Sequence, residues 1–258
     1  MTENTFFDNW EGRQIDFPSF GPSTWTLTKL ISEKNSQEGP EDFWNNGCIG
    51  SGHGTFLCHD VADNTQRGVM KILMQIPCEG SEPQPAELRR YQAATSYEQD
   101  LDITSQVNAL KVLTEYGCKS TPGILAMKQD LQKDTDSVPG GYIIYLLMNH
   151  LPGIQLSEAF FWNSRDSVRE EIRQAFKTAW LDCVRAGVLP TLPEIDHVFW
   201  DAGANKAYII GFRMSAPAKP HNIWRNCEWI AWEMAKPQDD YRWYTEKDPY
   251  PDMSEWKL

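Results

Sequence analysis

The sequence has little that would suit the chain to nucleic acid or to a membrane. Lys and Arg number 24 against 36 Asp and Glu, which gives a formal net charge of −12 at pH 7. Such a balance disfavours general binding to nucleic acid or anionic membranes, although it allows a local basic surface. The longest apolar run, residues 141–148, is far too short to span a bilayer. The first residues lack the basic and apolar parts of a signal peptide, so we expect a cytoplasmic protein with no membrane partner.

The sequence also lacks cysteines and histidines at the spacings that are typical of zinc sites. The chain has six cysteines, and none of them forms a Cys-x-x-Cys or Cys/His pattern of the kind that binds zinc; they stand at positions 48, 58, 78, 118, 183 and 227. We therefore expect reduced thiols and no metal ligands among them. The sequence contains no internal repeats, and it does not indicate an oligomeric state.

A glycine-rich stretch followed by a lysine is the main feature that is present. Gly50, Gly52 and Gly54 lie between two apolar, β-prone runs, and Lys71 lies inside the second run. Glycine permits positive φ and lets backbone N–H groups approach a ligand, so we predict a turn here that binds an anion. An ordinary hairpin is the alternative. Lys71 would place a positive charge beneath the bound ligand, or would form a structural salt bridge.

The periodicity of apolar residues predicts strands in the first half of the chain and helices in the second. Strands are expected at 24–31, within 43–76, at 123–129 and 141–148, and as a pair at 197–200 and 207–211; helices are expected at 86–116, 156–187 and 222–236. Gly117 is a plausible helix stop. We predict an α+β, bilobal protein with an N-terminal extension (1–42), a β-rich N-lobe (43–150) and a mainly helical C-lobe (151–258).

This order of elements resembles the protein-kinase-like and aminoglycoside-phosphotransferase-like fold over roughly residues 44–235. Val69-Met-Lys71 resembles the strand motif whose lysine holds the α- and β-phosphates of a nucleotide. The segment 146–153 is similar to the hinge that binds an adenine ring through its backbone. The resemblance implies that Met148, Asn149 and His150 contact a ligand there.

The acidic residues of the family are missing from the matching positions. Leu192 stands at the position of the catalytic base and His197 at that of the metal-binding Asn. Gly211 stands at the position of the family's magnesium-binding Asp, and Gln106 stands at the position of the glutamate that pairs with the lysine. Since phosphoryl transfer depends on positioned metal ions, the resemblance implies a degenerate, pseudokinase-like site without a conventional Mg²⁺ site.

Three nearby carboxylates could replace the missing acids, namely Glu194, Asp196 and Asp201. Among titratable residues we single out Asp196 and His197 as candidate catalytic groups together with Lys71, although a turn carboxylate and a packed histidine are equally ordinary explanations. His53, between the glycines, is a candidate ligand contact, and an exposed loop histidine is the more common case.

Positive charge collects near the same positions. Residues 202–227 contain no Asp or Glu, but they include Lys206, Arg213, Lys219, His221 and Arg225. Arg213 beside Gly211 would favour an anion in place of a cation. A solvated basic edge on an acidic protein is the alternative. If the 206–225 strip is a real surface, tRNA is a candidate partner.

Three functions follow from these features. The first is a repurposed, metal-free transferase that moves a group other than phosphoryl, for example an acyl or aminoacyl group from aminoacyl-tRNA, as in cyclodipeptide formation, in small-molecule biosynthesis. The second is a non-catalytic pseudokinase that binds a nucleotide or a partner protein. The third is an active small-molecule phosphotransferase with displaced acidic residues. We expect the first, with a small molecule or a nucleotide as the ligand.

Overall fold

The computed structural model describes residues 4–18 and 23–258. The chain divides into two compact units, which we call the N-terminal unit (Met1–Thr104 and Ile124–His150) and the C-terminal unit (Ser105–Gly123 and Leu151–Leu258). The division differs from the expected boundaries in two ways. Residues 14–17 and 23–36, expected in a separate extension, are strands of the N-terminal unit's sheet, and residues 105–123 group with the C-terminal half.

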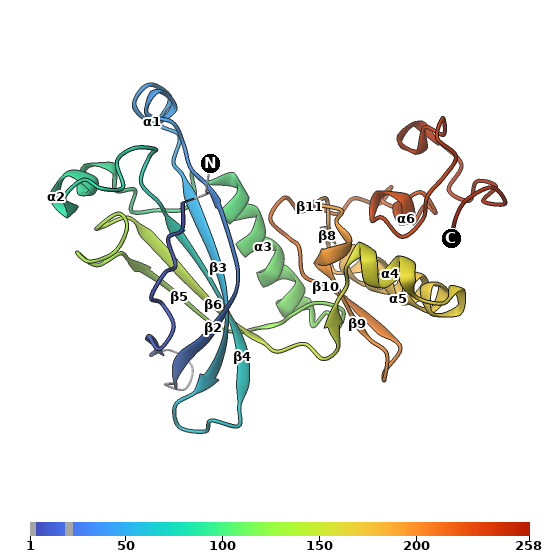
Figure 1. The fold of residues 1–258 in the computed structure, drawn as a ribbon, viewed down its shortest axis with the longest axis horizontal. Coiled ribbons are helices and arrows are strands. Elements are labelled where there is room, and N and C mark those ends of the chain that lie inside the picture. Colours follow the sequence, from blue (N-terminus) through green and yellow to red (C-terminus); the bar gives the residue numbers. More distant parts are fainter. Residues whose placement is uncertain (1–3, 19–22) are drawn as a thin grey trace. The chain divides into compact units, whose positions relative to one another are not determined.

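A six-stranded antiparallel sheet forms the N-terminal unit (Figure 1). Its strands, in spatial order, are β1 (Gln14–Phe17), β2 (Ser23–Ser36), β3 (Ser51–Asp60), β4 (Arg67–Gln75), β6 (Tyr142–Asn149) and β5 (Ile124–Leu131). Two short helices, α1 (Pro40–Asn46) and α2 (Ala86–Arg89), and a 3-10 turn, η1 (Arg90–Gln92), lie in its connections. The strands expected at 43–76, 123–129 and 141–148 are confirmed.

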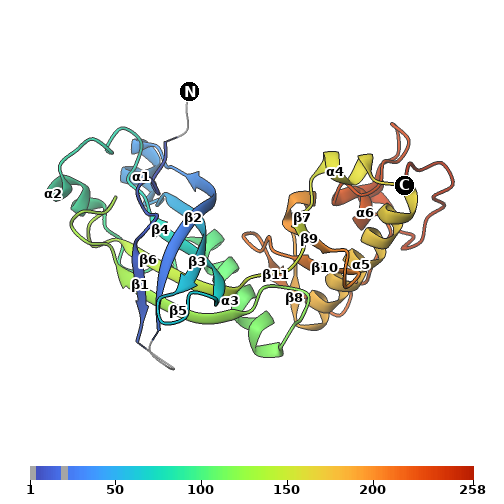
Figure 2. The same cartoon turned by 60° about the horizontal axis from the view of Figure 1, so that its bottom comes forward.

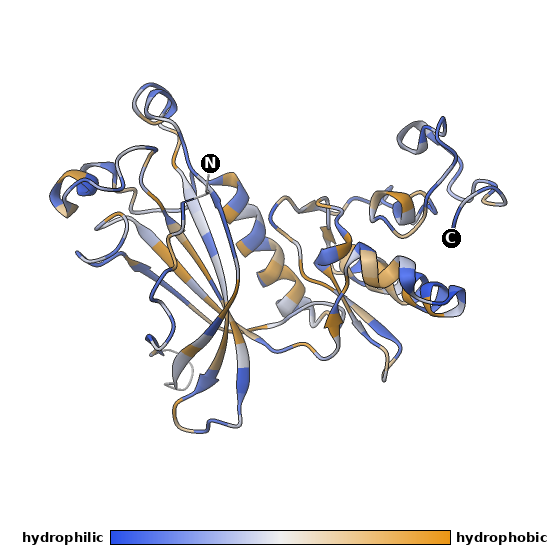
Figure 3. Ribbon diagram, in the orientation of Figure 1, coloured by the Kyte–Doolittle hydropathy of each residue, from blue (hydrophilic) through white to orange (hydrophobic). Residues whose placement is uncertain are grey.

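One face of this sheet is covered by the chain's own beginning. Phe7, Trp10, Ile15 and Phe17 pack in one cluster with alternate residues of the central strands, including Phe56, Met70, Ile72, Met74, Ile143 and Leu147. Successive strand residues point to opposite faces, so alternate apolar positions collect on one side. The hydropathy colouring shows apolar stretches along the strands of this sheet (Figure 3). The N-terminal segment is therefore part of the core.

Helix α3 (Leu101–Tyr116) is shorter than the helix expected from residue 86. Residues 92–94 are bound by the buried side chain of Gln75, which donates to the Gln92 carbonyl and accepts from the Ala94 amide. Those bonds replace the helical ones, and the chain is extended at Ala93. The stop at Gly117 is confirmed, because Gly117 has φ +77° and the Cys118 amide donates to the Leu113 carbonyl at 2.9 Å.

Helices and small sheets make up the C-terminal unit (Figure 2). Its helices are α4 (Glu158–Asn163), α5 (Asp166–Arg185), α6 (Glu228–Ala231) and the 3-10 helices η2 (Ile195–His197) and η3 (Trp243–Thr245). Its strands are β7 (Ile154–Gln155), β8 (Val188–Leu189), β9 (Val198–Asp201), β10 (Lys206–Ile209) and β11 (Ala216–Pro217). The expected hairpin is confirmed as β9–β10, and the expected helix at 156–187 appears as α4 and α5.

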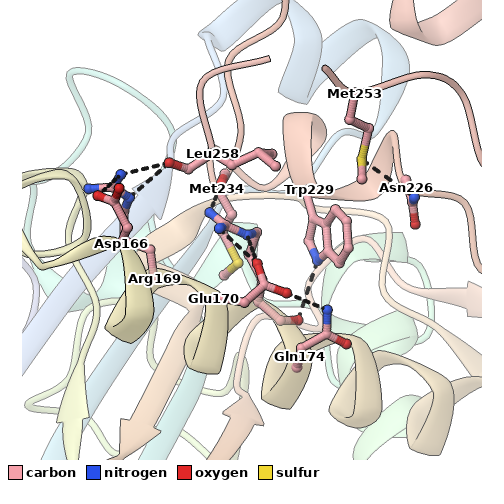
Figure 4. Close-up of polar contacts among 10 residues, drawn as sticks. Asp166, Arg169, Glu170, Gln174, Asn226, Trp229, Met234, Met253 and Leu258 are labelled. Carbon is pink, nitrogen blue, oxygen red and sulfur yellow. Dashed lines mark hydrogen bonds and ion pairs between the residues drawn. The ribbon is translucent and has the colours of Figure 1, made fainter. Parts of the chain in front are cut away.

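The helix expected at 222–236 is wrong beyond the single turn of α6. The tail is held by side chains of α5, whose Arg169 donates to the Leu258 carbonyl and whose Arg173 donates to the Met234 carbonyl (Figure 4). In the other direction, the indole N–H of Trp229 donates a hydrogen bond to the Arg173 carbonyl at 3.3 Å. These arginines supply hydrogen-bond donors to two carbonyls of the irregular tail. Within residues 4–18 and 23–258, no helix has both the length and the apolar character needed to cross a membrane.

Candidate functional site

The glycine-rich stretch lies in a strand and not in a turn. Gly52 and Gly54 are residues of β3, and neither they nor Gly50 has a positive φ. A Cβ on Gly54 would lie 2.7 Å from the ring of Phe7, and one on Gly52 would lie 2.9 Å from Ile76. Close packing of Phe7 and Ile76 against the backbone therefore accounts for Gly54 and Gly52. The expected turn is wrong, and the ligand role of Gly50, Gly52 and Gly54 stays a prediction.

Lys71 lies on β4, between Thr55 of β3 and Leu146 of β6. Strand alternation places it on the sheet face opposite Met70 and Ile72, which belong to the Phe7 core. His53 shares that opposite face, and it is buried with only 7% of its surface exposed. The expectation of an exposed loop histidine is therefore wrong, because residue 53 is inside a central strand. The ligand role of Lys71 remains a prediction.

The expected hinge lies at the end of β6. Met148 and Asn149 pair with Val69 and Gly68 of β4, and His150 follows on the surface. Gln106, which was expected at the position of a kinase-like glutamate, is fully buried in α3. These placements agree with the expected order of elements, and they do not test a ligand role for the three hinge residues.

In the C-terminal unit, His197 and Gly211 lie in direct contact. A Cβ on Gly211 would lie 2.4 Å from Cγ and Nδ1 of His197, so a side chain cannot fit there beside the ring. The Ile210 amide donates to the His197 carbonyl at 2.9 Å and fixes the two segments together. The two residues expected at metal-ligand positions of the kinase-like fold are therefore spatially coupled: the ring at 197 requires glycine at 211.

The orientation of the His197 ring is set by a backbone carbonyl. Nδ1 lies 3.2 Å from the Leu192 oxygen, and a carbonyl only accepts hydrogen bonds, so Nδ1 carries a proton. The other ring nitrogen, Nε2, lies 3.3 Å from Oε2 of Glu194. In the neutral ring, the lone pair of Nε2 then faces a carboxylate oxygen. That arrangement is favourable only if a proton or a cation lies between the two atoms.

Asp196 completes a cluster with these two residues. One ligand atom from each of Glu194, Asp196 and His197 lies within 4.8 Å of the others, and none of the three side chains is fully buried. A 3-10 helix places residues i and i+3 on one side, which brings Glu194 and His197 together. Gln155 of β7 donates to the Asp196 carbonyl at 2.6 Å and holds the turn.

The other candidate acid does not join this cluster. Oδ1 of Asp201 accepts from the amides of Gly203 and Ala204 at 3.0 and 3.3 Å and closes the β9–β10 turn. It is therefore a turn residue.

The basic residues of the 206–225 strip are divided among different roles. Arg225 donates to the carbonyls of Trp243 and Glu246, and Lys206 lies 4.8 Å from the ring centre of Tyr208. Arg213 is half-buried, and its carbonyl accepts from the Ser105 hydroxyl at 3.0 Å. Arg225 is thus a packing residue of the C-terminal tail, and it contributes less to a basic surface than the sequence suggested.

Two features of the site were not expected as such. The packing of Phe7 on the glycines has no local signal, because the ring comes from more than forty residues away in the chain. The cluster of Glu194, Asp196 and His197 does have one. Each of these three residues is a separate candidate in the sequence. Their spacing of i, i+2 and i+3 places the side chains on one side of the chain only if the segment forms a tight turn, such as the 3-10 helix seen here.

No family model matches this chain, and no curated protein matches it. Among solved structures, it is similar to the Cydia pomonella granulovirus kinase PK-1, with a TM-score of 0.42 and 10% sequence identity. The similarity covers 75% of this chain and 52% of the viral kinase, so the chain spans about half the length of that protein. What the chain binds is therefore inferred from its own residues.

Proposed function

We propose that this protein binds a divalent cation through Glu194, Asp196 and His197, and that the cation holds phosphate oxygens of a small-molecule or nucleotide ligand. The protein would then be a kinase-like phosphotransferase with displaced acidic ligands, the third function that the sequence allows. The observation that carries this proposal is the convergence of the three ligand atoms within 4.8 Å of one another.

The donor set suits a transition-metal ion better than magnesium. Mg²⁺ prefers oxygen ligands alone, whereas Mn²⁺ and Zn²⁺ accept a neutral imidazole together with carboxylates. Ligand atoms bound at about 2.0–2.2 Å to one ion lie about 3 Å apart, close to the 3.3 Å between Nε2 of His197 and Oε2 of Glu194. The Leu192 carbonyl supplies the outer hydrogen bond that metal-binding histidines normally make.

Three protein ligands leave positions open for phosphate oxygens or water. A cation there would neutralise negative charge on a phosphate group, which is the main requirement of phosphoryl transfer. The role of the protein's own residues is narrower. The Leu192 carbonyl keeps the Nε2 lone pair of His197 directed at the cluster, and Gln155 keeps the backbone of Asp196 in place.

Thermal unfolding with added metal tests the proposal. Mn²⁺ or Zn²⁺ should raise the Tm of the wild-type protein, because a ligand at 100 times its Kd stabilises the native state by about 2.7 kcal/mol. Glu194→Gln and Asp196→Asn should lose most of this rise. Glu171→Gln is the matched control, since it removes one exposed carboxylate of α5 outside the cluster. Equal metal-induced shifts in all four proteins would contradict the proposal.

The metal-free transferase is the second candidate, and the absence of acids from residues 202–227 favours it. Aminoacyl transfer from tRNA would need Lys206 and Arg213 to contact the RNA. Charge reversal at both residues should then weaken tRNA binding strongly, and the affinity that remains should depend less on salt concentration. No binding of tRNA at low salt would remove this variant, and stabilisation by ATP only with Mn²⁺ or Mg²⁺ would argue against every metal-free mechanism.

A further inference from the structure

A small cavity of the N-terminal unit lies where several connecting segments meet. Its volume is about 280 Å³, and its lining comes from the segment before β1, from the connection between β4 and α2, from α2 itself and from the β5–β6 connection. Phe6 and Pro77 are its apolar lining residues, and Arg89, Glu82 and Asp8 bring charge to it. No pattern in the sequence indicates this cavity, because its lining comes from distant parts of the chain.

Arg89 carries a hydrogen-bond donor that the fold does not use. Its Nε is buried and has no acceptor among residues 4–18 and 23–258, and neither carboxylate of the cavity forms an ion pair with it in that part of the chain. Buried polar groups of native proteins are nearly always hydrogen-bonded. A guanidinium presents several donors in a fixed fork that matches a carboxylate. The unused donor therefore points to an anionic group on a bound ligand.

The two carboxylates of the cavity are positioned by their neighbours. The Thr5 hydroxyl donates to Oδ2 of Asp8 at 2.7 Å, and the side-chain amides of Asn4 and Gln37 both donate to Oε1 of Glu82. These bonds use one oxygen of each carboxylate, and an ionised carboxylate has a second oxygen that also accepts hydrogen bonds. Both groups can therefore accept from a cationic group of a ligand while they stay in place.

Buried polar side chains also hold the connections that surround the cavity. Gln92, which is buried, accepts from the Cys78 amide at 2.9 Å, directly after the apolar lining residue of that connection. Gln132, also buried, accepts from the Val138 amide at 2.8 Å and so orders the segment that carries Ser137, a hydroxyl of the cavity wall. The lining is therefore organised before a ligand binds, which lowers the entropic cost of binding.

We propose that this cavity binds a free α-amino acid in its zwitterionic form. Arg89 binds the carboxylate, and Asp8 and Glu82 bind the ammonium group. A simple anion would be repelled by the two carboxylates and a simple cation by the arginine, whereas a zwitterion is attracted by both charges. Phe6 and Pro77 favour an apolar side chain on the amino acid. The volume lies near the lower end of the range for ligand pockets, about 300–1,000 Å³, which suits a small metabolite better than a nucleotide.

The test is thermal unfolding of the full chain with each common amino acid, without divalent cations, followed by calorimetric titration of the best binder. At least one amino acid with an apolar side chain should raise the Tm and bind saturably. Its amide has no carboxylate and its deamino acid has no ammonium group, so each should bind about tenfold more weakly or worse. Arg89→Met should weaken binding by a similar factor. Arg90→Met is the matched control, because Arg90 is exposed, pairs with Asp134 and does not line the cavity.

If Arg89→Met does not fold, the comparison of the amino acid with its amide on the wild-type protein still decides the question. The proposal is overturned if no amino acid binds, if the amide binds as tightly as the amino acid, or if the two arginine variants bind alike. Glu194→Gln should leave amino-acid binding unchanged, and a loss there would place the binding at the metal cluster and also overturn the proposal. Because the titration uses no metal, either proposal can fail without the other.

Discussion

The two units of this protein are stabilised by different kinds of contact. The N-terminal unit has a continuous apolar cluster in which Phe7 packs directly on the backbone of Gly54. The C-terminal unit packs tryptophan rings beside α5, and arginines of the same helix donate to carbonyls of the tail. Glycines that resemble a ligand-binding motif are thus used for packing in the first unit. Polar side chains that look like ordinary turn residues converge in the second.

The largest effect should come from removing the ring that covers the N-terminal sheet. Phe7→Ala should lower the free energy of unfolding by about 3–5 kcal/mol, because it leaves a cavity over β3. Urea denaturation followed by tryptophan fluorescence measures this change. Tyr91→Ala, which truncates a ring that is 80% exposed, is the control and should change stability little. Similar losses for both variants would contradict the packing role of Phe7.

A smaller loss is expected where His197 meets Gly211 in the C-terminal unit. Gly211→Ala places a methyl group against the ring and should cost about 1–3 kcal/mol. His197→Ala should remove most of that cost in the double variant, since the ring is the obstacle. The coupling is measured by a double-mutant cycle in urea. Additive effects would show that the 2.4 Å approach is relieved in some other way.

Arg173 offers a comparable test of the tail contacts. It is buried, is bonded to Glu170, and donates to the Met234 carbonyl. Arg173→Met keeps much of the side-chain volume but leaves the carbonyl unpaired, which should cost about 1–3 kcal/mol. Lys236→Ala breaks an exposed pair with Glu158 and should cost less than about 1 kcal/mol. Thermal unfolding of both variants compares the two contacts. An equal loss of stability would contradict the expectation that the buried contact contributes more than the exposed one.

Cysteine reactivity should also differ between the two units, and this difference can be measured on the folded wild-type protein. Burial raises the pKa of Cys58 in β3 to about 12, whereas the hydrogen bond from Cys183 lowers the pKa of Cys118 to about 6. The thiolate is the reactive form, and its fraction grows as pH rises through the pKa. Alkylation of Cys118 by iodoacetamide should therefore increase between pH 5 and about 7 and then level off. Cys58 should stay unmodified over that range, and mass spectrometry of alkylated peptides reads both sites.

The strands and the β9–β10 hairpin were predictable because their signals are local. Apolar alternation, the turn at 202–205 and the stop at Gly117 depend on neighbouring residues only. Both helices whose extent was predicted wrongly are held by distant side chains. Residues 92–94 bond to Gln75, whose side chain replaces helical hydrogen bonds there, and carbonyls of the tail accept from Arg169 and Arg173. Helical periodicity gives no information about such partners.

By itself, the sequence determined the strands of the first half, the β9–β10 hairpin and the acidic balance of the chain. Only the tertiary structure decided what the distinctive residues do. Gly54 accommodates Phe7, and Gly211 accommodates His197. The physical reason is that a side chain's function depends on the atoms within a few ångströms of it. In each of these pairs, those atoms come from a part of the chain that sequence spacing does not connect.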